Sequence, residues 1–335
     1  MKQVSGDALQ EEYYQINLDI LSSFNKFRPP LNIFRFRDDV ARIIPYYTVG
    51  GRLSKEQIEE LQGLVADGFI FVSRVDHPVY VKHISYQLDL VLVDSNLRET
   101  EIADIFSQAL TRRMEEFLEQ PVKAVFDKLY EDMMVFTEYL HADIMRSKAF
   151  LRRQKEEFSL ATHAVNSLFV GINLFRNVAP KQVTEGMSRK KLDHVCLGLL
   201  LHDLGMCKIP AFILSKPQRL TPDEQTKMIN HPRVGTEILS KLDLKYPDIE
   251  ECVLNHHERL NGKGYPMKKS GDNLGIMSRL CAVVDSYCAM TSERPFKESM
   301  APMKASAALL ADDGYDSRVT QSLQAMLIKD LKMKF

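Results

Sequence analysis

Histidine and aspartate side chains occur in this sequence at positions where a helical core would form. Val195 and Leu199 precede His202 by seven and three residues, which puts the imidazole on the apolar face of a predicted helix. Asp203 follows directly, and Asp285 stands in the run RLCAVVDSYCAM, where nearly every neighbour is small or apolar. A carboxylate in such a helix is expected to be buried, and a buried charge persists only when it is paired or bound to a metal.

Further histidines follow the same pattern. His163 and the adjacent pair His256 and His257 also fall three or four residues from apolar side chains, and His231 lies between them in the chain. A single histidine on an apolar face is more often a hydrogen-bonded core residue than a ligand. The ordered set of five histidines and two aspartates is poorly explained in that way. Imidazole and carboxylate suit divalent Fe, Mn or Zn, and one carboxylate can bridge two ions.

The length of 335 residues predicts two domains. Residues 1–97 are predicted to form a small α+β domain with a regulatory role. A helix is predicted over 55–66, capped by Ser54 and Gln57, and β-like runs follow at 69–74, 78–85 and 88–93.

The rest of the chain is predicted to be helical. Residues 98–150 read as a charged helical connector that Pro121 divides, and residues 151–335 read as an all-α domain. Ser188 and Thr221 are predicted helix caps, the latter with Pro222 and Glu224 in a capping box. The fold class is therefore mainly α, with a smaller α+β domain at the N-terminus.

Charge and cysteine content exclude several classes of protein. The 44 basic and 45 acidic residues give a formal net charge of −1, which argues against a protein that coats DNA or binds a membrane through a polybasic surface. The five cysteines show no CxxC spacing, which favours reduced thiols. With no apolar run long enough to span a bilayer, we expect a soluble cytoplasmic protein that binds neither DNA nor a membrane.

Motifs along the C-terminal part resemble the HD-GYP domain, a branch of the HD metal-dependent phosphohydrolases. The motifs are, in order, HAVNSL from His163, LLHDLGMCKIP, HPRVG from His231, HHERLNGKGYP from His256, and SRLCAVVDSYCAMTSERPF. The HHE and GKGYP segment together with HPRVG is the most specific part. The resemblance covers residues from about 155 to 300.

The resemblance implies an HD-type helical bundle that hydrolyses cyclic di-GMP to pGpG, in some members onward to GMP, in bacterial second-messenger signalling. Two divalent ions, Fe or Mn, would serve as cofactors. Asp203 would bridge them and, with His202, act in catalysis. The first ion would be held by His163, His202, Asp203 and Asp285, and the second by Asp203, His231, His256 and His257.

The resemblance also suggests how the substrate is bound. Arg294 and Lys297 match positions that contact phosphates, and Lys208 can substitute for a family lysine replaced here by Met206. Tyr265 has a catalysis-related or a structural role, with equal support for each. The loop at 261–266 either shapes the edge of the site or docks a GGDEF-type diguanylate cyclase. Formation of a homodimer is an alternative that the sequence leaves open.

Three further departures from the family pattern are present. Ser159 stands where members with three metals carry Glu, and Cys288 stands where many members have a second Asp, so both favour two metals over three. Asn261 replaces a usual Asp in the loop before the GYP residues.

Three other functions compete with hydrolysis of cyclic di-GMP. One is a catalytically weak module that binds a cyclic dinucleotide or a cyclase without turnover, which Met206 favours. Another is an HD hydrolase of a different phosphoester, such as another cyclic dinucleotide. The last is a structural helical protein, for which the ligand set would be a coincidence.

Overall fold

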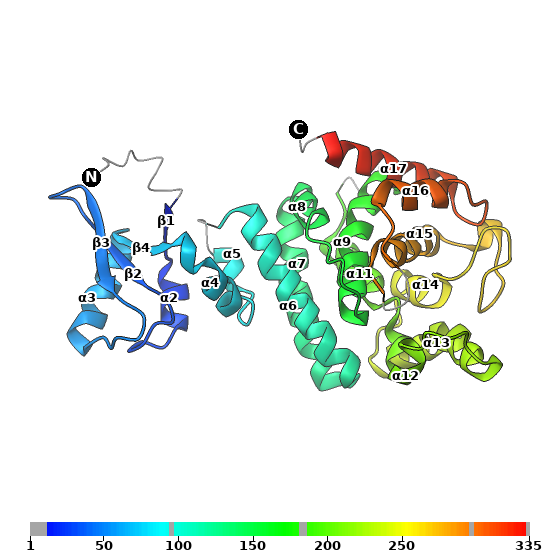
Figure 1. The fold of residues 1–335 in the computed structure, drawn as a ribbon, viewed down its shortest axis with the longest axis horizontal. Helices are drawn as coiled ribbons and strands as arrows, with labels where there is room; N and C mark the ends of the chain where they lie inside the picture. The colour runs from blue at the N-terminus through cyan, green and yellow to red at the C-terminus, as the bar shows by residue number, and fades with distance from the viewer. Residues whose placement is uncertain (1–11, 94–96, 181–185, 295–297, 333–335) are drawn as a thin grey trace. The chain divides into compact units, whose positions relative to one another are not determined.

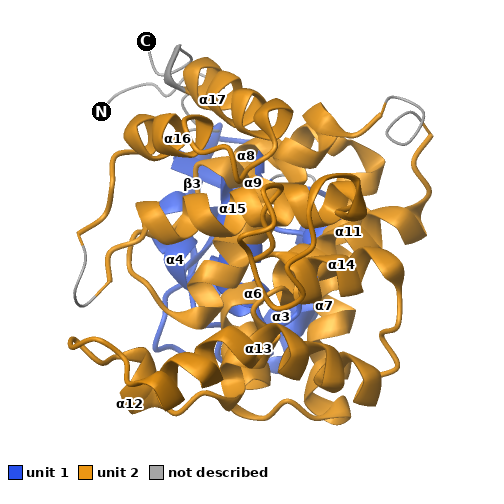
Figure 2. Ribbon diagram, turned by 90° about the vertical axis from the view of Figure 1, so that its right-hand side faces the viewer, with its two compact units in different colours: residues 1–109 blue, residues 110–335 orange. Residues whose placement is uncertain are grey.

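The computed structural model describes residues 12–93, 97–180, 186–294 and 298–332. The chain forms two compact units, residues 1–109 and residues 110–335 (Figure 2). The boundary falls inside helix α6 (Glu99–Glu119), within the stretch predicted as a helical connector.

Unit 1 combines a small antiparallel sheet with short helices, as the sequence predicted (Figure 1). The sheet has the order β1-β4-β2-β3, and its strands are β1 (Tyr13–Gln15), β2 (Ile33–Arg37), β3 (Arg42–Tyr47) and β4 (Ile70–Ser73). The helices are α2 (Leu18–Ser23), α3 (Lys55–Ala66), η1 (Arg74–Asp76), α4 (His77–Ile84) and α5 (Leu90–Val93). Helix α3 begins at the predicted cap, where Ser54 and Gln57 form a capping box.

The β-like runs at 78–85 and 88–93 are helical, so the strand prediction was wrong there. Pro78 occupies the first turn of α4, and Tyr80, Val81 and Ile84 are buried. Their spacing of one and three residues fits one face of a helix and not the alternation of a strand. The β-branched and aromatic residues that suggested strands instead pack on the buried side of α4.

Unit 2 is helical throughout its described residues, apart from an isolated bridge between Glu157 and Glu293. Its first helices after α6 are α7 (Lys123–Ala142), η2 (Ile144–Arg146), α8 (Ser147–Leu151), α9 (Leu160–Val178) and α11 (Arg189–Leu201). The later ones are η3 (Leu204–Lys208), α12 (Ala211–Leu214), α13 (Pro222–Lys241), α14 (Pro247–Asn255), η4 (Gly271–Asn273), α15 (Ile276–Thr291), α16 (Pro302–Leu310) and α17 (Ser317–Lys332). The predicted caps at Ser188 and Thr221 are confirmed.

Helix α9 forms the centre of unit 2. It is buried almost continuously from Ala161 to Phe175, as expected for a helix that is apolar on all sides. Helices α8, α11, α15 and α17 pack against it (Figure 1). Within the described parts of both units, every helix is too short or too polar to cross a membrane.

The backbones of η3 and α13 meet at Gly205. A Cβ atom on Gly205 would lie 1.9 Å from the carbonyl oxygen of His231 and 2.8 Å from the backbone nitrogen of Gly235. Only glycine fits this approach, and it brings the residues that precede η3 next to His231.

Replacing Gly205 with alanine should therefore lower stability. We expect Gly205→Ala to reduce the free energy of unfolding by about 1–3 kcal/mol, because η3 must move away from α13. The measurement is urea unfolding followed by far-UV circular dichroism. Gly63→Ala is the matched control, since Gly63 is exposed in α3 and a Cβ there meets nothing within 4 Å. It should raise stability by about 0.5–1 kcal/mol. Equal effects of the two changes would contradict the close approach.

Candidate metal centre

Five helical segments bring all seven predicted ligand residues together in unit 2. His163 lies in the first turn of α9, Asp285 in α15 and His231 in α13. The others stand where helices end: His202 and Asp203 between α11 and η3, and His256 and His257 directly after α14. They form two groups in which the potential ligand atoms lie within 4.8 Å of one another: His163, His202, Asp203 and Asp285, and Asp203, His231, His256 and His257.

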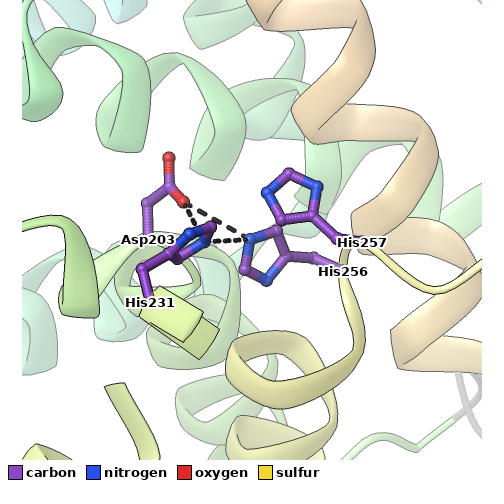
Figure 3. Close-up of side chains that lie close together, drawn as sticks. All are labelled: Asp203, His231, His256 and His257. Carbon is purple, nitrogen blue, oxygen red and sulfur yellow. Dashed lines mark hydrogen bonds and ion pairs between the residues drawn. The ribbon is translucent and has the colours of Figure 1, made fainter. Parts of the chain in front are cut away.

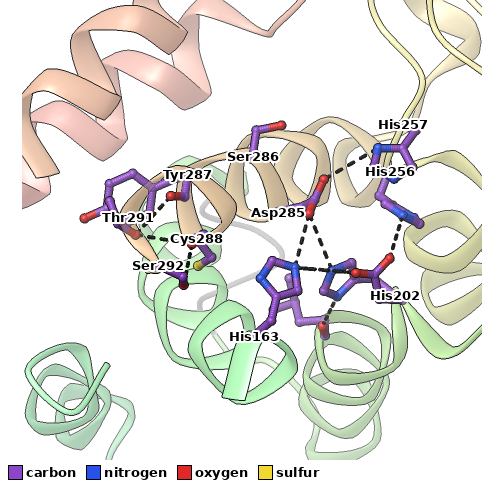
Figure 4. A network of polar contacts seen from close by, with 12 residues as sticks. His163, His202, His256, His257, Asp285, Ser286, Tyr287, Cys288, Thr291 and Ser292 are labelled. Atoms are coloured by element: carbon purple, nitrogen blue, oxygen red, sulfur yellow. Dashed lines mark hydrogen bonds and ion pairs between the residues drawn. The ribbon is translucent and has the colours of Figure 1, made fainter. Parts of the chain in front are cut away.

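The first group surrounds the ring of His163 (Figure 4). Its Nε2 atom lies 3.2 Å from Oδ1 of Asp285 and 3.2 Å from Nε2 of His202. Oδ2 of Asp203 is 3.6 Å from the same nitrogen. His163 and His202 are almost completely buried, at 1% and 0% exposure, so water cannot solvate these polar atoms freely.

The second group uses the other oxygen of Asp203 (Figure 3). Oδ1 of Asp203 lies 3.2 Å from Nε2 of His231 and 3.3 Å from Nε2 of His256. Those two nitrogens are 3.0 Å apart. Nδ1 of His257 lies 3.6 Å from Oδ2 of Asp285, which links this group to the first. The Asp203 carboxylate is therefore shared, with one oxygen facing each group.

Backbone carbonyls orient three of the rings through the nitrogen that faces away from the centre. Nδ1 donates to a carbonyl at 2.8 Å in His202, 2.6 Å in His231 and 2.9 Å in His256, the acceptors being those of Leu199, Met228 and Cys252. Such a bond fixes the tautomer, so in the neutral ring Nε2 presents a lone pair to the centre. Converging lone pairs 3.0 Å apart, beside a carboxylate, repel one another unless a cation lies between them.

The ionisation of the cluster also favours a cation. Burial lowers the pKa of His202 to about 4, so this ring is neutral at neutral pH. Burial opposes ionisation of Asp203, but His202 and hydrogen bonds from His231 and His256 outweigh it and hold the pKa of this carboxyl well below its usual range. Burial likewise lowers the pKa of His231, yet its hydrogen bond to Asp203 outweighs that effect and raises the pKa. Positive charge is thus stabilised between Asp203 and His231, and the nitrogen and oxygen donors suit a divalent metal ion.

The loop after His257 is held by a buried carboxylate that the sequence analysis left unassigned. Glu258 is 1% exposed and accepts hydrogen bonds from the backbone N–H groups of Met267, at 2.6 Å, and Lys269, at 3.0 Å. Gly264 packs so closely that a Cβ would lie 2.5 Å from the carbonyl oxygen of His257. Glu258 is the third residue of the HHE motif and could have been singled out from the sequence. Its hydrogen-bond partners, the backbone N–H groups of Met267 and Lys269, are evident only in the folded loop.

The loop places Tyr265 beside the cluster. Its backbone N–H donates to the carbonyl of His257 at 3.2 Å, and its ring centroid lies 4.6 Å from that of His257. Burial raises the pKa of the Tyr265 hydroxyl, so this residue presents a neutral phenol. Asn261 donates to Asp313 at 2.9 Å and accepts from the N–H of Lys263, which gives it a structural role in the loop.

The predicted substrate-binding cations differ in their surroundings. The guanidinium of Arg294 lies 4.3 Å from the ring centroid of Phe158, and that ring lies 5.9 Å from His163. Nε of Arg294 is buried and has no hydrogen-bond partner among the described residues. Lys208 is exposed at the end of η3, while Lys297 lies outside the described residues. Phe158, which supports Arg294, was missed because its contact joins segments more than 130 residues apart.

Three departures from the family pattern have physical explanations in the structure. Met206 is 9% exposed and packs with Ile209 and Ile213 in a small apolar cluster. Ser159 caps α9 through a capping box with Thr162, so it serves the helix. Cys288 is fully buried, and burial raises the pKa of its thiol to about 12.

Known proteins are similar to the part of this chain that carries the two groups. Residues 166–319 match the family model described as HD domain. A solved structure of Bd1817, a HDG"Y"P protein from Bdellovibrio bacteriovorus, has a TM-score of 0.59 at 17% identity and covers 94% of this chain and 99% of that one. This similarity confirms the fold, and the HD-domain match includes six of the seven predicted ligand residues, all except His163.

Curated relatives are similar over shorter stretches. The cyclic di-GMP phosphodiesterase response regulator RpfG of Xanthomonas campestris is 36% identical over 141 residues, which is 41% of this chain and 37% of that protein. A probable cyclic di-GMP phosphodiesterase of Vibrio cholerae is 31% identical over 216 residues, 58% of this chain and 48% of that one. The 3'3'-cGAMP-specific phosphodiesterase 2 of Vibrio cholerae is 31% identical over 130 residues, which is 38% of this chain and 25% of that protein. The chain thus spans less than half the length of these relatives.

The shared carboxylate predicts a specific loss of metal. Asp203→Asn should remove most bound divalent metal, because it takes one anionic oxygen from each group, while His163→Gln should weaken only the first group. Elemental analysis of anaerobically purified protein, with the rise in melting temperature on adding Mn²⁺, checks both. His194→Gln is the matched control, because His194 lies on α11 and stacks on Tyr246. Metal content in Asp203→Asn equal to that of His194→Gln would rule out a shared ligand.

Proposed function

We propose that this protein hydrolyses cyclic di-GMP to the linear dinucleotide pGpG, using two divalent metal ions. The observation that carries the proposal is the pair of His and Asp groups that share Asp203. Fe or Mn is the proposed metal, since imidazole and carboxylate ligands suit both. The names of the curated relatives support the reaction class and cyclic dinucleotides as substrates.

The residues of the site have separate roles in this reaction. His163, His202, Asp203 and Asp285 would hold one ion, and Asp203, His231, His256 and His257 would hold the other. Divalent ions in such a site act as Lewis acids on a phosphoester and activate water for attack on phosphorus. Asp203 orients the nucleophile. The hydrogen bond from Nδ1 of His202 to the carbonyl oxygen of Leu199 fixes the position of the His202 ring.

Positive side chains of unit 2 bind the phosphates in this proposal. Arg294, whose guanidinium lies over the ring of Phe158, offers an Nε without a hydrogen-bond partner among the described residues. Lys297 and Lys208 add positive charge, and the neutral phenol of Tyr265 lines the edge near His257. Residues 1–97 serve as the regulatory domain, and the loop at 261–266 shapes the edge of the site or docks a GGDEF-type cyclase.

Two other functions have specific support. Relatives named as 3'3'-cGAMP phosphodiesterases support a different cyclic dinucleotide as substrate. The apolar packing of Met206, in the place of a family lysine, supports a module that binds a cyclic dinucleotide with little turnover.

Turnover by the metal-loaded protein distinguishes these functions. Chromatography should show pGpG formed from cyclic di-GMP, and the double variant His202→Ala with Asp203→Ala should lose at least 100-fold in rate while its circular dichroism is retained. A panel with 3'3'-cGAMP ranks the substrates by kcat/KM. Binding of cyclic di-GMP without any product would favour the binding module, and unchanged turnover in the double variant would exclude the assigned site.

Arg294 should act mainly in substrate binding. Because a charged hydrogen bond to phosphate contributes about 1.5–3 kcal/mol, Arg294→Ala should raise KM by about 10- to 100-fold, with metal content unchanged. Steady-state kinetics measures this change, and Arg219→Ala, an exposed arginine elsewhere on unit 2, is the control. A KM like that of the control would exclude Arg294 from the substrate site.

A further inference from the structure

A cavity of about 370 Å³ lies in unit 2, away from the metal groups. It is bordered by the end of α7, by η2, by the C-terminal half of α9 and by α11. Helices α7 and α9 each pack against α11 (Figure 1). Along α9, thirteen residues separate its Arg176 from His163, a distance of about 20 Å in a helix. The cavity is therefore a separate site on the same helix.

The walls of the cavity are mostly apolar. Leu140, Ile144, Ile172, Phe175 and Leu192 contribute to the lining. Its volume lies in the lower part of the range of small-molecule sites, about 300–1,000 Å³, which are also mainly apolar with a few fixed polar groups. The polar side chains in the lining are those of His141, Asp143 and Arg176.

Arg176 is a half-buried cation that forms no ion pair with a described residue. Its Nη1 donates long hydrogen bonds, 3.4 Å to the carbonyl of Ile144, 3.3 Å to Oγ of Ser147 and 3.4 Å to Sδ of Met145. Burial lowers the pKa of Arg176, and the nearby Asp143 carboxylate opposes this effect without cancelling it. By contrast Arg113, in α6, is also half-buried but lies 2.7 Å from Asp132. A buried cation is usually paired, because desolvating it costs free energy that only an anion offsets.

The charges around Arg176 select a ligand with one negative charge. Asp143 lines the same cavity, but its carboxylate accepts the N–H of Met145 at 2.8 Å instead of pairing with the guanidinium. One cation and one nearby carboxylate would oppose a dianion such as a phosphate monoester. A planar carboxylate matches the two parallel donors of a guanidinium.

We propose that this cavity binds a small organic carboxylate, with its anionic group on Arg176 and its apolar body against Ile172, Phe175 and Leu192. The site does not depend on the proposed hydrolase activity. It lies between helices α9 and α11, which carry His163 and His202, so an occupant stabilises the helices on which the metal groups are built.

The test is isothermal titration of the full chain with phenylacetate and hexanoate, each compared with its uncharged amide. We expect saturable binding of at least one carboxylate, at least tenfold tighter than its amide. Arg176→Gln should weaken that binding at least tenfold, and Arg189→Gln, a nearby arginine paired with Glu138, should not. Metal content should be the same in both variants.

A second variant tests the proposal even if Arg176→Gln fails to fold. Ala142 is exposed at the end of α7 and lines the cavity, so Ala142→Trp blocks the space without entering the core. It should abolish carboxylate binding while its melting temperature stays near that of the unchanged protein. The proposal is overturned if neither carboxylate binds at millimolar concentration, if acid and amide bind equally, or if both Arg176→Gln and Ala142→Trp bind as the unchanged protein does.

Discussion

The carboxylate of Asp203 is the interaction on which the centre of unit 2 depends. Its two oxygens face different histidine groups, at 3.6 Å from His163 and at 3.2 Å from His231. A buried anion is unfavourable unless positive charge joins it. Helices α9, α11, α13, α14 and α15 all end or pass at this point, so their packing and the ionisation of the cluster are coupled.

The surrounding residues hold this arrangement through the backbone more than through other side chains. Backbone carbonyls within α11, α13 and α14 accept hydrogen bonds from the outer ring nitrogens of His202, His231 and His256. Each helix therefore orients one histidine of the cluster. Gly205 allows η3 to touch α13, and Glu258 binds two N–H groups of the loop that covers His257. The backbone thus fixes the orientation of several side chains of the cluster, while Arg294 lies over Phe158 and Lys208 is exposed at the end of η3.

Much of the fold and most of the site could be predicted from sequence because their signals are local. Capping boxes at Ser54 and Thr221 mark helix starts within four residues, and the seven His and Asp residues stand in short motifs. The residues of α4 and α5 could not be placed in the same way. Their Val- and Tyr-rich runs suit a strand by composition, and they form helices because Tyr80 and Ile84 are buried together on one side.

The sequence by itself determined the all-α class of the C-terminal part and its helix starts, and it contains in short motifs the seven His and Asp residues that form the two groups. Only the tertiary structure decided that Asp203 faces both groups, that Phe158 supports Arg294, and that Arg176 is half-buried without an ion pair to a described residue. Periodicity and capping act over a few residues along the chain. Sharing a carboxylate, stacking a guanidinium or enclosing a cavity depends instead on how segments distant in sequence approach one another in the packed bundle.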